Sequence, residues 1–178
     1  MGTGYEHTGE LAIDLANTLE LRRDGTTADL LADPDGLARW LRGTGGPGGL
    51  EDVRAGQLRA LREHVLALLG GAVRRRPLPR AAVSAVNRAA AGAPAVVQLE
   101  AGELVVRYNA SPGDAFLADV AGSAITLVGG PGRGRLRRCG APGCGRRFVA
   151  SRPRQRWHSP SCGNRARVAR FQQRHRAA

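Results

Sequence analysis

All three cysteines of the 178-residue chain fall in one short stretch near its C-terminal end, and a histidine lies among them. Cys139 and Cys144 are separated by four residues, and His158 stands four positions before Cys162. Thiolate sulfur and imidazole nitrogen are ligands that Zn²⁺ prefers, and four of them complete a tetrahedral site. Three cysteines cannot all pair as disulfides, so this grouping favours a metal site in a reducing compartment. We expect these four residues to bind Zn²⁺.

The zinc is expected to be structural rather than catalytic. A catalytic site keeps one position open for water. Here four protein ligands are available, and no acidic residue that could act as a general base follows Asp119. The segment is too small to fold on apolar burial alone, so the ion would stabilise it by on the order of 10 kcal/mol. Phe148 and Trp157 would form its small core.

The formal net charge of +12 is not spread evenly along the chain. Residues 131–178 contain fourteen arginines and no acidic residue, whereas residues 1–130 contain thirteen arginines and all fifteen acidic residues. The first part therefore has a formal charge of −2. A nearly neutral body with a strongly cationic end is typical of a protein that meets a polyanion at that end.

A basic helix is predicted directly after the third cysteine, over residues 163–176. A guanidinium stays ionised and forms forked hydrogen bonds to phosphate or guanine, so a basic helix braced by zinc suits a nucleic-acid groove. Solubility, or docking onto an acidic protein, is the alternative explanation of the charge. The arginines expected to contact nucleic acid, with duplex DNA as the preferred partner, are Arg165, Arg167, Arg170 and Arg174 in the helix and Arg152, Arg154 and Arg156 before it.

Helical periodicity and capping signals predict an α-rich body. Helices are predicted over residues 9–23, 50–70, 79–91 and 112–128, and a short one opens at Asp33, the N-cap, followed by Pro34. β-Branched residues on both sides of a turn containing Gly102 predict one β-hairpin, over residues 96–99 and 104–108. Gly70 and Gly71 are expected to end the helix over residues 50–70, and residues 43–49 to form a flexible connection.

The predicted fold class is α+β and mostly α. An α-rich domain with one β-hairpin would span residues 1–130. A small zinc finger, consisting of a knuckle followed by the basic helix, would span residues 131–178. The boundary is placed at residues 129–134, because a run rich in Gly and Pro is typical of an interdomain linker.

Three polar residues interrupt the apolar pattern of the first predicted helix: Asp14, Asn17 and Thr18. Asp14 and Asn17 are three positions apart and share a helix face. They could form a solvated stripe that hydrogen-bonds back to the helix. They could instead turn inward to anchor a loop or to line a pocket for a small ligand. The sequence leaves both possibilities open.

No combination of nucleophile, base and acid is recognisable in the body, so we do not expect an enzyme. His7 and His64 could converge with Asp14 and Asn17 in a pocket, but one sequence cannot show convergence. The apolar stretch over residues 11–21 contains Asp14, Asn17 and Glu20, so neither a signal peptide nor a membrane span is expected. These features predict a cytoplasmic protein.

Two sets of segments resemble known families. Residues 135–139 (RLRRC), 144–148 (CGRRF) and 161–170 (SCGNRARVAR), together with Arg156 and Trp157, resemble the CGNR zinc finger, which is named for its Cys-Gly-Asn-Arg signature. Residues 11–18 (LAIDLANT), 37–41 and 58–62 (LRALR), together with Asn87, resemble the ABATE domain that usually precedes this finger.

The resemblance implies a bacterial stress-induced transcription regulator, with a treble-clef-like finger that binds DNA and a body that is regulatory or senses a ligand. It also exposes two departures in this chain. The family usually has Cys at the position of His158, which here makes three thiolates and one imidazole. The family tends to have Asp at the position of Ala150, so any capping role of that carboxylate is missing.

Two other functions are compatible with the same residues. The basic finger could bind RNA, although sequence-specific RNA binding prefers exposed aromatic residues, and Phe148, Trp157 and Phe171 are all expected to be packed. The body could instead bind a small molecule, with the finger as a docking module. A small-molecule effector and a homodimer are further expectations that the sequence alone does not decide.

Overall fold

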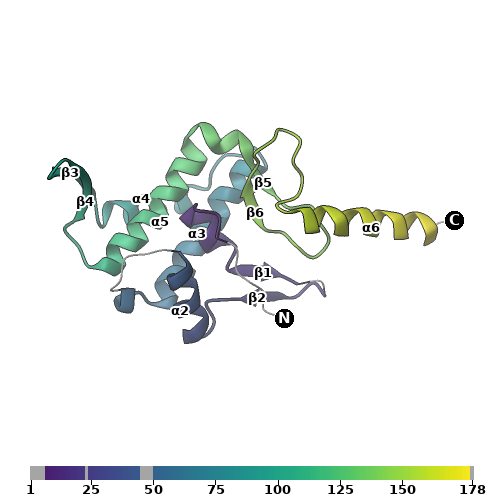
Figure 1. Ribbon diagram of the computed structural model, residues 1–178, viewed down its shortest axis with the longest axis horizontal. Coiled ribbons are helices and arrows are strands. Elements are labelled where there is room, and N and C mark those ends of the chain that lie inside the picture. The colour runs from purple at the N-terminus through teal and green to yellow at the C-terminus, as the bar shows by residue number, and fades with distance from the viewer. Residues whose placement is uncertain (1–6, 23, 45–49, 177–178) are drawn as a thin grey trace.

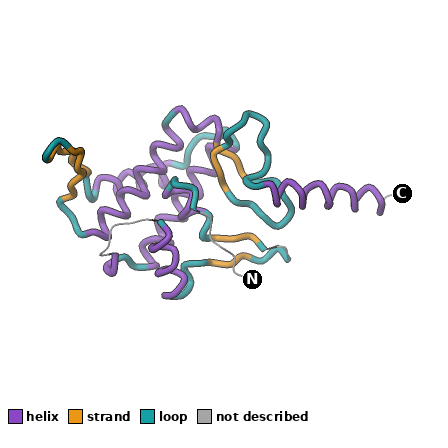
Figure 2. Tube along the Cα trace, in the orientation of Figure 1, coloured by secondary structure: helices purple, strands orange, loops and turns teal. Residues whose placement is uncertain are grey.

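The structure is a computed structural model and describes residues 7–22, 24–44 and 50–176 of the chain. The described residues are mostly helical, with three separate two-stranded antiparallel sheets (Figures 1 and 2). This confirms the predicted fold class and adds two hairpins to the one expected. The elements are α1 Leu11–Ala16, β1 Leu19–Leu21, β2 Thr27–Asp29, α2 Pro34–Gly43, the 3-10 turn η1 Leu50–Asp52, α3 Ala55–Val73, α4 Arg80–Ala91, β3 Ala95–Glu100, β4 Glu103–Tyr108, α5 Pro112–Gly129, the 3-10 turn η2 Pro131–Arg135, β5 Leu136–Arg138, β6 Arg147–Val149 and α6 Pro160–Arg176.

The body core lies where α1, α3, α4 and α5 pack together. Ile13, Leu58, Val86 and Val120, one from each of these helices, are completely buried. Each such side chain stabilises the fold by about 1.5–3 kcal/mol relative to an exposed one. Helix α1 is short, its residues from Ala12 to Ala16 are all buried, and it packs against α3, α5 and β6 (Figure 1).

The helix predicted over residues 9–23 is wrong beyond Ala16. The chain leaves the helix at Asn17 and continues into the hairpin β1–β2, in which Leu19 is opposite Asp29. Thr18 explains the change, because its hydroxyl donates to the Leu15 carbonyl at 2.6 Å and accepts from Arg62 at 2.8 Å. The apolar residues of this stretch fit a helix and a strand equally well, so periodicity could not separate the two.

The prediction that the glycine pair ends its helix is also wrong. Helix α3 begins at Ala55, after the turn η1, and continues through Gly70 and Gly71 to Val73. A Cβ atom at Gly71 would lie 3.2 Å from the Leu78 side chain, so the glycine lets the following segment fold back closely against α3. The missing side chain at Gly71 therefore lets Leu78 pack closely against α3, and the glycine pair does not end the helix.

The remaining predicted elements are confirmed with small shifts of their ends. Asp33 caps α2 by accepting from the Gly36 amide at 2.7 Å, and Ser111 caps α5 by accepting from the Asp114 amide at 3.1 Å. Within the connection predicted at residues 43–49, Gly43 belongs to α2, and residues 45–49 lie outside the described residues. No helix among the described residues is long and apolar enough to cross a membrane.

The hairpin β5–β6 packs against both the body core and the smaller core of the C-terminal part. Leu136 is buried in the body core, and Val149 beside it packs against the same core. Phe148 is on the opposite face of the hairpin and is buried with the three cysteines in a second, smaller core. The run predicted as a linker is the end of α5 and the turn η2, and η2 contacts α5 and α3. A domain boundary after residue 130 stays a prediction.

Arg62 is the charged group on which the β1–β2 hairpin depends. It is 5% exposed, and its guanidinium donates two hydrogen bonds of 2.6 Å to the Asp29 carboxylate. Replacing Arg62 with Ala should lower the free energy of unfolding by about 2–4 kcal/mol, because Asp29 and Thr18 lose their partner inside the protein. Urea unfolding measures this, with the exposed Arg88→Ala on α4 as a control that should change it by less than about 0.5 kcal/mol.

The same pair predicts a pH dependence. Hydrogen bonds from Arg62 hold the pKa of Asp29 below its ordinary value of 3.8. The contribution of the pair is therefore complete above that pH and is lost as the pH falls further. Wild-type stability should fall more steeply below about pH 4 than that of the Arg62→Ala variant. Parallel curves for the two proteins would contradict the role of this pair.

Candidate metal centre and basic surface

Three cysteines and one histidine meet between the β5–β6 hairpin and the start of α6. Their ligand atoms, the sulfurs of Cys139, Cys144 and Cys162 and a ring nitrogen of His158, all lie within 4.8 Å of one another. Cys144 Sγ is 3.6 Å from His158 Nδ1. The fold therefore brings together all four residues that the sequence proposed as ligands, in an arrangement that could hold one metal ion.

Local sequence explains how each half of the cluster is shaped. Gly143 and Gly145 flank Cys144 with φ angles of 62° and 81°, which glycine adopts without strain, so the backbone can turn sharply around the thiol. At the other half, Ser159 Oγ accepts from the Cys162 amide at 3.3 Å and begins α6. Gly163 leaves room for the Trp157 ring, which a Cβ atom at this position would meet at 3.4 Å.

The electrostatics of the cluster oppose three thiolates without a cation. Burial raises the pKa of Cys144 to about 12, and the neighbouring Cys139 and Cys162 add to the rise. Burial also opposes ionisation of Cys139, but hydrogen bonds from the backbone of Ala141 and His158, together with those from Cys144 and Cys162, outweigh it and lower its pKa. A divalent cation would reverse this balance, since it deprotonates a coordinating thiol outright.

The arginine of the Cys-Gly-Asn-Arg run is directed at the cluster. The Arg165 guanidinium donates to Cys162 Sγ at 2.9 Å, three positions away on the same helix. We predicted Arg165 as a nucleic-acid contact, whereas the structure places its guanidinium against a ligand sulfur. A donor in this position orients the ligand sulfur. The spacing of three on a helix was the signal that could have indicated this role.

Gln155 holds the loop in which the family's Asp is replaced. Ala150 is 1% exposed. The next residue, Ser151, donates from its amide and hydroxyl to Gln155 Oε1, at 2.9 and 3.1 Å. The Gln155 amide group then donates to the Trp157 carbonyl at 3.0 Å. A neutral side chain thus braces the segment before His158 without a carboxylate at position 150.

Most of the other predicted nucleic-acid residues surround two grooves along α6. Arg152, Arg154 and Arg167 line a groove of about 510 Å³ that also contains Trp157. Arg167, Arg170 and Arg174 line a second groove of about 790 Å³, beside Phe171. Arg156 is exposed but lines neither groove. The side chains of the first groove therefore form a cationic surface directly beside the ligand cluster.

The three predicted pocket residues lie inside the body, and a common ligand pocket for them stays a prediction. All are buried, so a solvated stripe is excluded. Asp14 accepts from the amide and hydroxyl of Thr8, at 2.8 Å each, and Thr18 is occupied by Leu15 and Arg62. Asn17 lines a cavity of about 230 Å³ between α1 and the finger, with His7, Thr8, Glu10, Phe148, Gln155 and His158 among its other lining residues.

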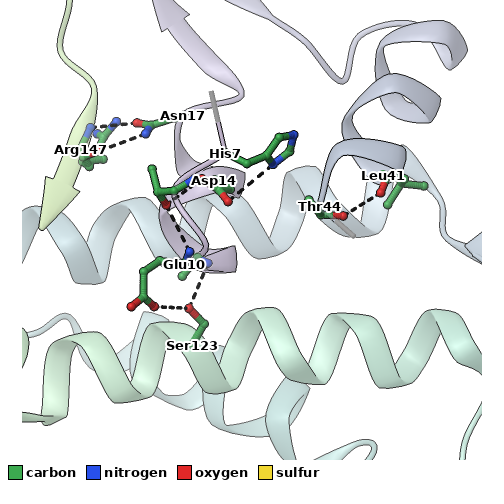
Figure 3. Close-up of polar contacts among 10 residues, drawn as sticks. His7, Glu10, Asp14, Asn17, Leu41, Thr44, Ser123 and Arg147 are labelled. Carbon is green, nitrogen blue, oxygen red and sulfur yellow. Dashed lines mark hydrogen bonds and ion pairs between the residues drawn. The ribbon is translucent and has the colours of Figure 1, made fainter. Parts of the chain in front are cut away.

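Asn17 anchors the finger hairpin to the body. Its side-chain oxygen accepts from the Arg147 amide at 2.8 Å, and its side-chain nitrogen donates to the Arg147 carbonyl at 3.0 Å (Figure 3). Next to this contact, Arg146 pairs with Glu20 at 2.5 Å. Sequence reasoning missed both contacts, because their partners are more than 120 positions apart.

Replacing Asn17 with Ala should lower the free energy of unfolding by about 1–3 kcal/mol, because both peptide groups of Arg147 lose a partner. The free energy of unfolding of Asn17→Asp should lie between those of the wild type and Asn17→Ala, because an aspartate still accepts from the Arg147 amide but cannot donate to its carbonyl. Denaturant unfolding measures both, with the exposed Asn87→Ala on α4 as the control. An Asn17 variant as stable as the control would exclude the anchoring role.

Comparison with known proteins finds two family models that match successive parts of the chain. Residues 9–131 match the ABATE family, described as "Putative stress-induced transcription regulator". Residues 135–175 match the CGNR zinc finger family. No curated protein matches the chain. The chain therefore belongs to the ABATE family and carries a CGNR zinc finger.

Proposed function

We propose that the chain is a zinc-dependent transcription regulator that binds duplex DNA through the surface around α6. One observation carries the proposal: the groove lined by Arg152, Arg154 and Arg167 lies directly against the ligand cluster. The whole segment from residue 131 onward contains no acidic residue that could compete for these guanidinium groups. The description of the ABATE family agrees with a regulator.

Zinc is the proposed ion because of the donor set. Three thiolates and one imidazole in a buried cluster form a closed tetrahedral set, as in structural zinc sites. Softer sulfur ligands disfavour magnesium and calcium, which prefer oxygen. The role of the ion would be to hold Cys139 and Cys144 of the knuckle against Cys162 of α6, and so to fix the direction of the helix.

The shape of α6 supports the proposed contact with nucleic acid. The helix extends away from the rest of the chain at one end of the molecule (Figure 1). Its exposed arginines repeat over two turns beyond the ligand cluster, at Arg167, Arg170 and Arg174. A helix anchored at its first turn and free of other elements along its length can be laid in the major groove.

One observation favours RNA as a second candidate. Phe171 is 56% exposed, between arginines of the same helix, so the expectation that all aromatic residues of the finger are packed is wrong for this one. Its ring is available to stack on an unpaired base, with His175 tilted against it at 4.2 Å. Phe148 is buried and Trp157 is partly buried, as expected.

The proposed regulatory role of the body rests on its contacts with the finger. Asn17 and Glu20 bind residues of the loop and strand that follow Cys144, so a change in the body would reach the ligand cluster through a few bonds. An effector that acts in this way, and a homodimer, stay predictions. So does the small-molecule receptor in which the finger only docks onto another protein.

The zinc proposal predicts about one zinc per chain for the wild type, by elemental analysis after gel filtration, as expected for a four-ligand site. Cys144→Ser should lose the metal and the helical signal of α6 in circular dichroism. His158→Cys should keep the metal, because a thiolate completes the same tetrahedral set. A wild-type protein that retains its circular dichroism spectrum after complete chelation would exclude the organising role of zinc.

The DNA proposal predicts salt-sensitive binding of the full chain to duplex DNA. With about six phosphate contacts, affinity should fall roughly a thousandfold or more between about 50 and 200 mM salt. The double variant Arg154→Gln and Arg167→Gln should weaken binding at least tenfold, whereas the exposed pair Arg59→Gln and Arg88→Gln in the body should not. Fluorescence anisotropy measures both.

Competition with structured RNA separates the two candidates. Preferential displacement by RNA, together with a loss in Phe171→Ala that exceeds the loss on duplex DNA, would favour the RNA function. The absence of salt-sensitive binding to either nucleic acid would exclude both.

A further inference from the structure

Two arginines face each other across the finger hairpin without a carboxylate between them. Arg138 on β5 and Arg147 on β6 are direct antiparallel partners. Side chains in such positions lie close together, and like charges directly opposite each other are destabilising. The hairpin has only three residues in each strand, so this pair makes up a third of its register.

A third arginine comes from the body. Leu136 and Val149, which share the hairpin face with Arg138 and Arg147, are packed in the body core, so this face is directed toward the body. Helix α3 contacts β5, and Arg74 directly follows the end of α3. Arg147 is half-buried, and burial together with the charges of Arg138 and Arg74 lowers its pKa to about 10. The charges of Arg138 and Arg74 therefore act on the guanidinium of Arg147.

None of these three arginines forms an ion pair with a carboxylate within the described residues, whereas the neighbouring Arg146 pairs with Glu20. The negative end of the α3 dipole accounts for Arg74 alone, with a contribution of about 0.3–1 kcal/mol. It does not account for the opposed pair on the hairpin. Arg138 lies over the knuckle, because a Cβ atom at Gly145 would be 3.1 Å from its Nη2. The three positive charges at this junction have no carboxylate partner in the part of the chain that the structure describes.

We propose that Arg74, Arg138 and Arg147 form an anion site that takes a phosphate group of the nucleic-acid backbone. The inference rests on the proposed function and extends it, since the bound strand would pass from the finger onto the body. Three guanidinium groups suit a phosphate because each can donate two forked hydrogen bonds to its oxygens. Arg74 and Arg138 are exposed and accessible, while Arg147 forms the half-buried floor.

The site also explains why the body is held so closely to this hairpin. The backbone of Arg147 is fixed by Asn17 of the body through two hydrogen bonds. A phosphate bound by Arg147 would therefore contact a finger residue whose position the body also fixes. Any shift of α1 would move the floor of the site, which gives the body a direct way to modulate nucleic-acid affinity.

The test compares two double variants of equal charge change in the full chain. Arg74→Gln with Arg138→Gln removes two members of the site. Arg76→Gln with Arg133→Gln removes two exposed arginines from neighbouring segments. Zinc content is measured for each variant, because Arg138 directly precedes the ligand Cys139. Arg74→Gln alone is included because it changes the site without changing a neighbour of a ligand in the sequence. Each protein is titrated with duplex DNA and with structured RNA at several salt concentrations. Thermal unfolding is followed in phosphate and in chloride of equal ionic strength.

The site variant should bind the preferred nucleic acid about tenfold more weakly than the control variant, with a salt slope smaller by about one. Phosphate should raise the unfolding temperature of the wild type and of the control variant, but not of the site variant. If both variants behave alike in both assays while the wild type binds nucleic acid, the inference is overturned and the proposed function stands.

If the wild type binds no nucleic acid but phosphate still stabilises it through Arg74 and Arg138, the proposed function fails. The site then takes free phosphate or a phosphorylated small molecule, and the nucleic-acid assignment is overturned. Stabilisation by phosphate that survives in the site variant would place the anion elsewhere and would overturn the site itself.

Discussion

The structure depends on one short hairpin that packs apolar side chains into a core from each of its two faces. Leu136 and Val149 complete the body core from one face of β5–β6, and Phe148 closes the small core around the cysteines from the other. Because apolar burial is roughly proportional to area removed from water, these few side chains tie the ligand cluster to the body more firmly than a linker would. A metal ion bound there would fix the direction of α6 relative to the body.

The two parts of the chain differ in whether their arginines have carboxylate partners. In the body, the buried Arg62 is neutralised by Asp29, and Glu20 reaches over to neutralise Arg146. In the finger, residues from 131 onward contain no acid, and the arginines along the two α6 grooves and on the hairpin stay without carboxylate partners among the described residues. This contrast makes the finger and its junction with the body the natural place for an anionic partner.

Local signals predicted the elements that depend on neighbours in sequence. Asp33 caps its helix as expected, and Gly102 lies in the turn of β3–β4 with a φ of 87°. The same reasoning failed at the end of α1, because Thr18 in the turn before β1 accepts a hydrogen bond from Arg62, which is 44 positions away. The prediction at Gly71 failed for a related reason, because this glycine allows close packing of Leu78 instead of ending the helix.

The sequence by itself determined the donor set of the metal centre, because Cys139, Cys144, His158 and Cys162 are recognisable by chemistry and spacing alone. It also determined that the cationic charge lies at one end. Only the tertiary structure decided what individual cations do: Arg165 turns to a ligand sulfur, Arg146 finds Glu20, and Arg138 meets Arg147 without a counter-ion. The physical reason is that the net effect of a charge depends on its neighbours in space, and folding brings these from distant parts of the chain.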